Sequence, residues 1–240
     1  GSFTTVGAFT GGFAKLSTST GLVDRSFPPI AGSVYALTPD GSGGAYIAGN
    51  FTYVDGQARP ILAHILADGG VNPNWSPNVT GGAVVSLFKS GNTLYFGGEF
   101  TSVNGTTRVN VAAVRTDDTG SLLPWNPSPN FGVTTISGDD SAIYVGGAFT
   151  SIGGQSRNRL AALDLSTGNA LAWNPTQSAT TISLVSARAG LVYVGGIFGS
   201  IGGQARNNLA ALNGVASGNA NATSWNPSVN QQVNTIAFDD

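Results

Sequence analysis

Short runs of alternating apolar and polar residues, separated by turn residues, cover most of the chain. Residues 133–175 give the clearest example, and no window there or elsewhere keeps a helical period. Glycine, serine and aspartate at 138–141 and 166–169 indicate turns, while 151–158 has the character of a longer loop. The pattern predicts four short antiparallel strands at Val133–Ser137, Ala142–Thr150, Arg159–Leu165 and Ala170–Asn174.

The same pattern recurs along the chain with a nearly fixed period. The aromatic residues Phe3, Phe51, Phe100, Phe149 and Phe198 follow at steps of 48, 49, 49 and 49. Arg59, Arg108, Arg157 and Arg206 are each 49 apart, and Phe27, Trp75, Trp125, Trp173 and Trp225 step by 48, 50, 48 and 52. A period of this size indicates a repeat architecture. We therefore expect a single domain over 1–240, with repeats at approximately 1–44, 45–93, 94–142, 143–190 and 191–240.

A sheet of four short strands has two faces to bury and cannot bury both alone. Radial packing of such sheets buries both faces and gives a β-propeller, whereas an α-solenoid needs amphipathic helices that the chain lacks. The prediction is an all-β, five-bladed β-propeller with four-stranded antiparallel blades.

The fifth blade is expected to combine both ends of the chain. Its first strand would come from Val233–Asp240, and its later parts from Phe3–Val6, Phe13–Gly21 and Leu22–Pro28. Nothing corresponds to Ser141–Gly146, which forms most of the second strand in the fourth repeat. Two explanations stay open: the natural chain extends further, or a neighbouring subunit or another segment donates the strand.

Residues 144–175 follow the pattern YVGGxFxxxxGxxRxxLAxLxxxTGxxxxWNP. This pattern resembles the delta-60 repeats of bacterial secreted proteins, a Kelch-like β-propeller repeat, and the resemblance covers nearly the whole chain. It implies an extracellular or surface location and carries over no catalytic residues.

Composition narrows the function classes. Charged residues make up 9% of the chain and the net charge is −2, so we expect no nucleic-acid partner. Apolar runs are short, which predicts no membrane insertion. The absence of Cys excludes disulfides and thiolate chemistry, and the absence of Met means that Gly1 is not a translation start. The Asn-, Thr- and Gly-rich, Lys-poor composition favours a secreted or cell-surface protein.

Polar and aromatic side chains should gather on one rim of the ring. The second and fourth strands run parallel, so the loops that follow them share this rim. Aromatic, amide and guanidinium groups together can bind sugars, but periodic Trp and Arg residues also serve as blade packing and as donors to loop carbonyls. The candidate ligand residues are Arg59, Arg108, Arg157, Arg206, Gln155, Gln204, Trp75, Trp125, Trp173 and Trp225.

Other candidate chemistry is weak, and no cofactor or metal site is predicted. The pairs Asp117–Asp118, Asp139–Asp140 and Asp239–Asp240 lack the spacing of a Ca²⁺ loop and fit solvated turns better. His64 replaces an alanine of the repeat and has no triad pattern near it, and Glu99 is the only Glu. We therefore predict a non-enzymatic scaffold or adhesion module, binding proteins or its own copies through the incomplete fifth blade. The alternative is a glycan-binding propeller, and an enzyme ranks last.

Overall fold

Four antiparallel sheets, one in each of four successive repeats, dominate the computed structural model, which describes residues 11–12, 14–24, 27–215 and 222–239. We call these sheets blades 1 to 4 in chain order. Across the described residues the regular elements are all strands, so the all-β prediction is confirmed. Blade 1 contains β2 (Ile30–Pro39), β3 (Ala45–Val54) and β5 (Leu62–Ile65), and blade 2 contains β7 (Val84–Ser90), β8 (Thr93–Gly98) and β11 (Val111–Arg115). Blade 3 contains β12 (Val133–Gly138), β13 (Ile143–Gly147) and β16 (Leu160–Leu163), and blade 4 contains β17 (Thr181–Arg188), β18 (Leu191–Ile197) and β21 (Leu209–Asn213).

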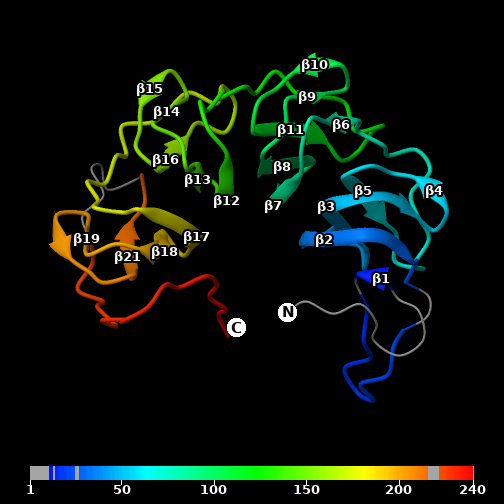
Figure 1. Cartoon of the computed structure of the whole chain (residues 1–240), viewed down its shortest axis with the longest axis horizontal. Coiled ribbons are helices and arrows are strands. Elements are labelled where there is room, and N and C mark those ends of the chain that lie inside the picture. Colours follow the sequence, from blue (N-terminus) through cyan, green and yellow to red (C-terminus); the bar gives the residue numbers. More distant parts are fainter. Residues whose placement is uncertain (1–10, 13, 25–26, 216–221, 240) are drawn as a thin grey trace.

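The blades follow one another around an arc, with the first strand of each blade on its inner side (Figure 1). Neighbouring first strands are in contact, and from blade 2 to blade 4 side-chain hydroxyls rather than a backbone ladder join them. The amide of Ile136 donates to Ser86 Oγ at 2.9 Å, and the amide of Val185 donates to Thr135 Oγ1 at 3.0 Å. Blades 2 and 3 have a neighbouring blade on each side, and this radial arrangement buries both faces of their sheets, as the repeat pattern predicted.

The fourth strand of each blade, however, is not formed. The segment predicted at Ala170–Asn174 makes only an isolated bridge from Ala170 to Leu163. Its backbone groups are used elsewhere, since the Leu171 amide donates to Ala162 O and the Leu171 carbonyl accepts from an arginine side chain. Each blade thus has three main strands and a bridged outer segment, and two further short strands extend the sheet of blade 1 to five.

The loop predicted at 151–158 contains a short hairpin instead of remaining irregular. The two-residue strands β14 (Ser151–Ile152) and β15 (Gln155–Ser156) pair with each other in blade 3. The remaining small strands are β9 (Ser102–Val103) with β10 (Thr106–Thr107), β19 (Ser200–Ile201) with β20 (Gln204–Ala205), β4 (Gln57–Ala58) on the end of β3, β6 (Val79–Thr80) on β9, and β1 (Gly11–Gly12) parallel to β2.

The glycine pair that ends the second strand has a steric reason. A Cβ on Gly147 would collide with the carbonyl oxygen of Gly132, the residue just before the first strand of the same blade. The equivalent collisions involve Gly49 with Ser33, Gly98 with Ala83, and Gly196 with Thr181. A glycine pair in a strand indicates either a close backbone approach or a bend, and the structure shows the close approach here.

The two ends of the described chain form parts of a further repeat. Residues 232–239 are not a strand, which corrects the prediction for Val233–Asp239, yet they lie beside β17: Ser183 Oγ donates to Val233 O at 2.7 Å. In the equivalent contact of blade 3, Thr134 Oγ1 donates to Ile182 O at 2.8 Å. At the other end, Leu16 bridges to Val23 as the third strand does to the fourth segment elsewhere. No strand pairing joins these ends within the described residues; Phe3–Val6 and Asp240 lie outside them.

Candidate functional site

The repeated arginines use their guanidinium groups inside their own repeats. Arg157 Nη1 donates to the carbonyl of Ser156 at 2.8 Å, and Nη2 donates to that of Leu171 at 2.7 Å. The equivalent bonds run from Arg59 to Ala58 and Pro73, from Arg108 to Thr107 and Leu123, and from Arg206 to Ala205 and Thr223. Each guanidinium group therefore links the small hairpin to the bridged outer segment. This is the role as donor to loop carbonyls that the sequence analysis set against sugar binding.

Three of the four tryptophans lie in the joints between blades. Trp75, Trp125 and Trp173 are buried, and each indole Nε1 donates to a carbonyl at the end of the next blade's third strand. The acceptors are Arg115, Asp164 and Asn213, at 2.8, 2.9 and 2.8 Å. Trp225 differs, because it is 42% exposed and the described residues supply no acceptor for its Nε1.

A tyrosine accompanies each tryptophan, and our sequence analysis missed it. Tyr46, Tyr95, Tyr144 and Tyr193 lie edge-on to the Trp of their own blades, with ring centroids 4.9, 5.0, 5.2 and 5.6 Å apart. Burial raises the pKa of the Tyr46, Tyr95 and Tyr144 hydroxyls above its ordinary value. These four tyrosines are spaced 49 residues apart, so the same period that revealed the arginines could have revealed them.

Each buried Tyr–Trp pair packs on the same set of positions in the next blade. We call this set the receiving face. It consists of one apolar residue from each of the three strands, together with the residue that directly follows the one on the third strand. The sets are Leu87, Leu94, Val114 and Arg115 in blade 2, Ile136, Ile143, Leu163 and Asp164 in blade 3, and Val185, Val192, Leu212 and Asn213 in blade 4. The tyrosine hydroxyl reaches the turn beyond this face: Tyr95 Oη donates to Leu165 O at 3.1 Å, and Tyr144 Oη accepts from the Val215 amide at 3.2 Å.

On the predicted rim, the structure places the two kinds of loop side by side, but it does not bring all of the candidate side chains together. The Gly153 amide in the blade 3 hairpin donates to the Pro127 carbonyl at 2.7 Å, so the hairpin meets the exit segment of the preceding repeat. A hollow of about 510 Å³ lies at this meeting point, lined among others by Asn126, Gln155 and Asn169. Gln155 and its counterpart Gln204 are exposed, whereas neither Arg157 nor Trp125 lines the hollow.

His64 has partners that the sequence did not reveal. His64 Nε2 and Asp40 Oδ2 are 3.1 Å apart, and Asn72 Nδ2 lies 3.1 Å from His64 Nδ1. Burial of the Asp40 carboxyl opposes its ionisation, but bonds from the Ser42 amide, the His64 ring and the Gly44 amide outweigh burial and lower its pKa. The ring also stacks on Tyr46 at 4.2 Å between centroids. The histidine is therefore buried, with both ring nitrogens within hydrogen-bond distance of a partner.

The aspartates act mainly as turn acceptors. Asp118 accepts from the Gly120 and Ser121 amides, and Asp139 from the Ser141 and Ala142 amides. Bonds from the Thr167 amide and from the Ser166 and Thr167 hydroxyls lower the pKa of Asp164 to about 2. In the part of the chain that the structure describes, no three His, Cys, Asp or Glu side chains gather as metal ligands. The same part contains no helix with the length and apolar character to cross a membrane.

Comparison with known proteins agrees with the architecture. Residues 140–165 match a family model described as "Domain of unknown function (DUF5122) beta-propeller". The matched stretch includes β13 and β16, the second and third strands of blade 3. This match and the all-β blades support a protein of the β-propeller class. None of the curated proteins matches the chain.

Proposed function

We propose that this chain is a non-enzymatic scaffold or adhesion module, secreted or on the cell surface, that acts through protein–protein contacts. In this proposal the ring has five blades of the delta-60, Kelch-like type, and both described ends contribute to the fifth blade. The observation that carries it is the exposure of Trp225, in contrast to three buried equivalents. An indole that packs a joint everywhere else is here available to a partner.

The opposite end of the arc supports the same proposal. Leu16 is 47% exposed, whereas Ile65, Val114, Leu163 and Leu212, which bridge to the outer segment in the same way, are all buried. Both exposed residues belong to the further repeat, so the apolar surface lies where a fifth blade would need packing. The uncharged composition and the use of the repeated arginines inside the scaffold favour contacts of this kind over catalysis.

Sedimentation velocity tests the proposal. We expect the purified chain to associate reversibly as its concentration rises, and Trp225→Asp to suppress that association. Phe131→Asp is the control, because Phe131 is an exposed aromatic outside the further repeat. A chain that remains monomeric over the whole range, or one in which both variants behave alike, contradicts a contact role for these ends.

A glycan-binding propeller is the alternative, and the hollow lined by Asn126, Gln155 and Asn169 favours it because amide groups suit sugar hydroxyls. A glycan array distinguishes the two. Sugar binding that is lost in Gln155→Ala supports the alternative. Binding to no sugar, or binding unaffected by Arg157→Ala, Arg206→Ala and Gln155→Ala, removes it.

A further inference from the structure

A second hollow lies between blades 2 and 3, where the first strands of the two blades begin. It measures about 320 Å³. The repeat of blade 2 contributes Gly82, Ala83 and Glu99 to its lining, and the repeat of blade 3 contributes Gly132, Thr134 and Ala148. Because the first strands β7 and β12 form the inner side of the arc, the hollow lies on that side of the molecule.

Small residues open this hollow. The residue two positions before the first strand of blade 2 is Gly82, and the residue after the glycine pair of blade 3 is Ala148. At the joint between blades 3 and 4, the equivalent residues are Phe131 and Ile197, which both carry large side chains. The repeat does not require small residues at these positions, so the hollow belongs to one joint rather than to the shared scaffold.

Glu99 is the charged residue of this hollow. It is the one glutamate of the chain, and it stands where the other repeats have Asn50, Ala148 and Ile197. None of the residues that line the hollow is Lys, Arg or His. The carboxylate is therefore a local addition that neither the repeat nor a neighbouring positive charge explains.

The side chain of Glu99 reaches across the joint. A Cβ on Gly132 would lie 2.9 Å from Glu99 Cγ and 3.0 Å from Oε1, so the carboxylate lies against the backbone of blade 3. Within the described residues, it accepts no hydrogen bond and forms no ion pair. The Thr134 hydroxyl is directed elsewhere, towards the carbonyls of Gly146 and Ile182 at 3.2 and 2.8 Å. Both carboxylate oxygens are thus available to a ligand.

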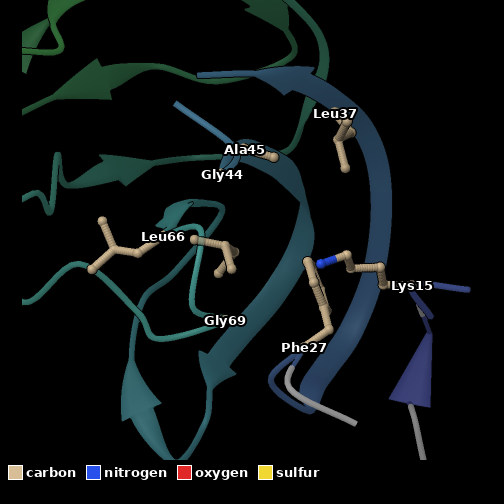
Figure 2. Close-up of a pocket in the computed structure, with 9 residues that line it drawn as sticks. Lys15, Phe27, Leu37, Gly44, Ala45, Leu66 and Gly69 are labelled. Carbon is tan, nitrogen blue, oxygen red and sulfur yellow. The ribbon is translucent and has the colours of Figure 1, made fainter. Parts of the chain in front are cut away.

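The cavity on blade 1 treats its charge differently. That cavity measures about 160 Å³, and its lining includes Leu37, Leu66 and Lys15 (Figure 2). Lys15 Nζ is paired with Asp24 Oδ2 at 3.0 Å, so its charge is compensated within the chain. The described residues provide no such partner for Glu99, which makes the hollow between blades 2 and 3 the better candidate for a charged ligand.

The lining favours one class of cation. Ca²⁺ and Mg²⁺ need several oxygen ligands, and no group of three acidic or histidine side chains gathers in the described part of the chain. The other walls are glycine backbone and the side chains of Ala83, Val85 and Val133, which can pack on an apolar stem. An alkylammonium group has both parts, since its nitrogen donates to a carboxylate and its alkyl chain covers apolar surface.

We propose that this hollow binds a primary alkylammonium group, with Glu99 as its counter-ion. Free amines and lysine side chains share this chemistry, and the probes described below distinguish the two sources. The inference goes beyond the proposed function and does not depend on it, because Trp225 is not among the lining residues.

A titration followed by NMR tests the proposal. We would add n-butylammonium chloride to the isotopically labelled full chain and record the backbone amide shifts, with n-butanol as the neutral probe of similar size. We expect saturable shifts centred on Gly82, Gly132 and Ala148, with a dissociation constant in the millimolar range. The neutral probe should bind at least about fivefold more weakly, because it lacks the charge-assisted hydrogen bond.

A second amine identifies the source of the ligand. Nα-acetyl-lysine methylamide presents the same ammonium group on a peptide backbone. If it binds as tightly as n-butylammonium or more tightly, the site takes a lysine side chain of a partner. If n-butylammonium alone binds, the site takes a free amine.

Three protein variants locate the site. Glu99→Gln preserves the shape of the side chain but removes its charge, and it should weaken n-butylammonium at least about fivefold. Asp55→Asn is the matched control, because it removes one charge from an exposed residue outside the hollow and should leave binding unchanged. Ala148→Ile introduces the residue that blade 4 carries at this position, fills the hollow and should abolish the shifts.

The inference is overturned by any of four results. These are the absence of saturable shifts, shifts centred on other residues, equal binding of n-butanol, and equal affinity of Glu99→Gln and Asp55→Asn. Thermal melting checks that each variant folds, and Ala148→Ile carries the test if Glu99→Gln does not fold. Self-association through Trp225 is measured separately, so a failure of the ammonium site leaves that contact role unaffected.

Discussion

At the scale of single residues, the four repeated arginines form their hydrogen bonds within the scaffold. Each of the four arginines at the repeat spacing donates to the carbonyl of the residue before it and to a carbonyl in the outer segment. A planar guanidinium reaches two carbonyls from two nitrogens held at fixed positions, whereas an ammonium group donates from a single nitrogen on a flexible stem. The four Nε atoms are buried and have no hydrogen-bond partner among the described residues, and Arg59 Nη2 also bonds to Gln57 Oε1 and to the Asn72 carbonyl.

This argument predicts the effect of Arg157→Lys. The variant keeps the charge but loses one of the two carbonyl bonds, so we expect the free energy of unfolding to fall by about 1–2 kcal/mol. Urea unfolding measures the change. Arg159→Lys, at a neighbouring arginine outside the repeated series, is the control. Equal stability of wild type and Arg157→Lys would show that the fork contributes nothing to folding.

Asp164 leads to a prediction about acid. Its pKa of about 2 lies below the ordinary value of 3.8, because the folded turn binds the carboxylate form. The stabilisation is therefore complete above pH 3.8 and is lost as the pH falls towards 2. We expect Asp164→Ala to reduce the free energy of unfolding at pH 7 by about 1–2 kcal/mol, and the gap from wild type to narrow between pH 4 and pH 2. Chemical unfolding at several pH values checks this, and a gap independent of pH would contradict it.

At the scale of the element, the glycine pair sets the path of the second strand. The second glycine leaves room for the carbonyl of the first strand, and the glycine before it leaves room for a side chain of the next blade. Gly97 lies against Val133 and Gly146 against Ile182 in this way. The pairing register shifts at the same place, between Val84 and Ser86 in blade 2 and between Val133 and Thr135 in blade 3.

Substituting the second glycine should therefore be costly. We expect Gly147→Ala to destabilise the chain by about 1–3 kcal/mol, because the new methyl group overlaps the Gly132 carbonyl. Thermal melting of this variant should be compared with that of Gly199→Ala, where a Cβ meets only the Ser178 hydroxyl at 3.9 Å. A Gly147→Ala protein as stable as Gly199→Ala would refute the steric account.

The sequence predicted those features of the fold that every repeat needs. The first three strands, the close approach at the glycine pair and the packing of Trp75, Trp125 and Trp173 all follow from needs that each repeat shares. The fourth strand was wrong because Leu171 and its equivalents give their carbonyls to arginine forks and Trp173 turns towards the next blade. His64 and Asp40 could not be paired beforehand, because this pair occurs in one repeat and is separated by 24 residues.

At the scale of the whole molecule, the joints between blades hold the arc together. Each of blades 1 to 3 provides a Tyr–Trp pair and each of blades 2 to 4 provides a receiving face, so stability depends on contacts between neighbours. Blade 4 retains its pair without a described receiving face, and blade 1 presents Leu37, which stands at the receiving-face position of Ile136 and is 44% exposed.

The joints predict unequal effects for one substitution made at two places. Trp173→Phe removes the bond to the Asn213 carbonyl inside a buried joint, and we expect a loss of about 1–3 kcal/mol. Trp225→Phe should change stability by less than about 0.5 kcal/mol, because this ring is partly exposed. Urea unfolding compares the two. Similar losses at both positions would mean that Trp225 is packed in solution.

The indole bonds also have a direction, because each runs from one blade to the blade that follows it in the chain. The surface at Trp225 and the surface at Leu37 are therefore unlike, and neither is complementary to itself. A single contact between the Trp225 surface of one copy and the Leu37 surface of another joins the copies head to tail, whereas a two-fold dimer needs both such contacts at once. A single head-to-tail contact leaves one free surface of each kind, so assembly through single contacts would not stop at a dimer. It would continue into a filament or close into a larger ring.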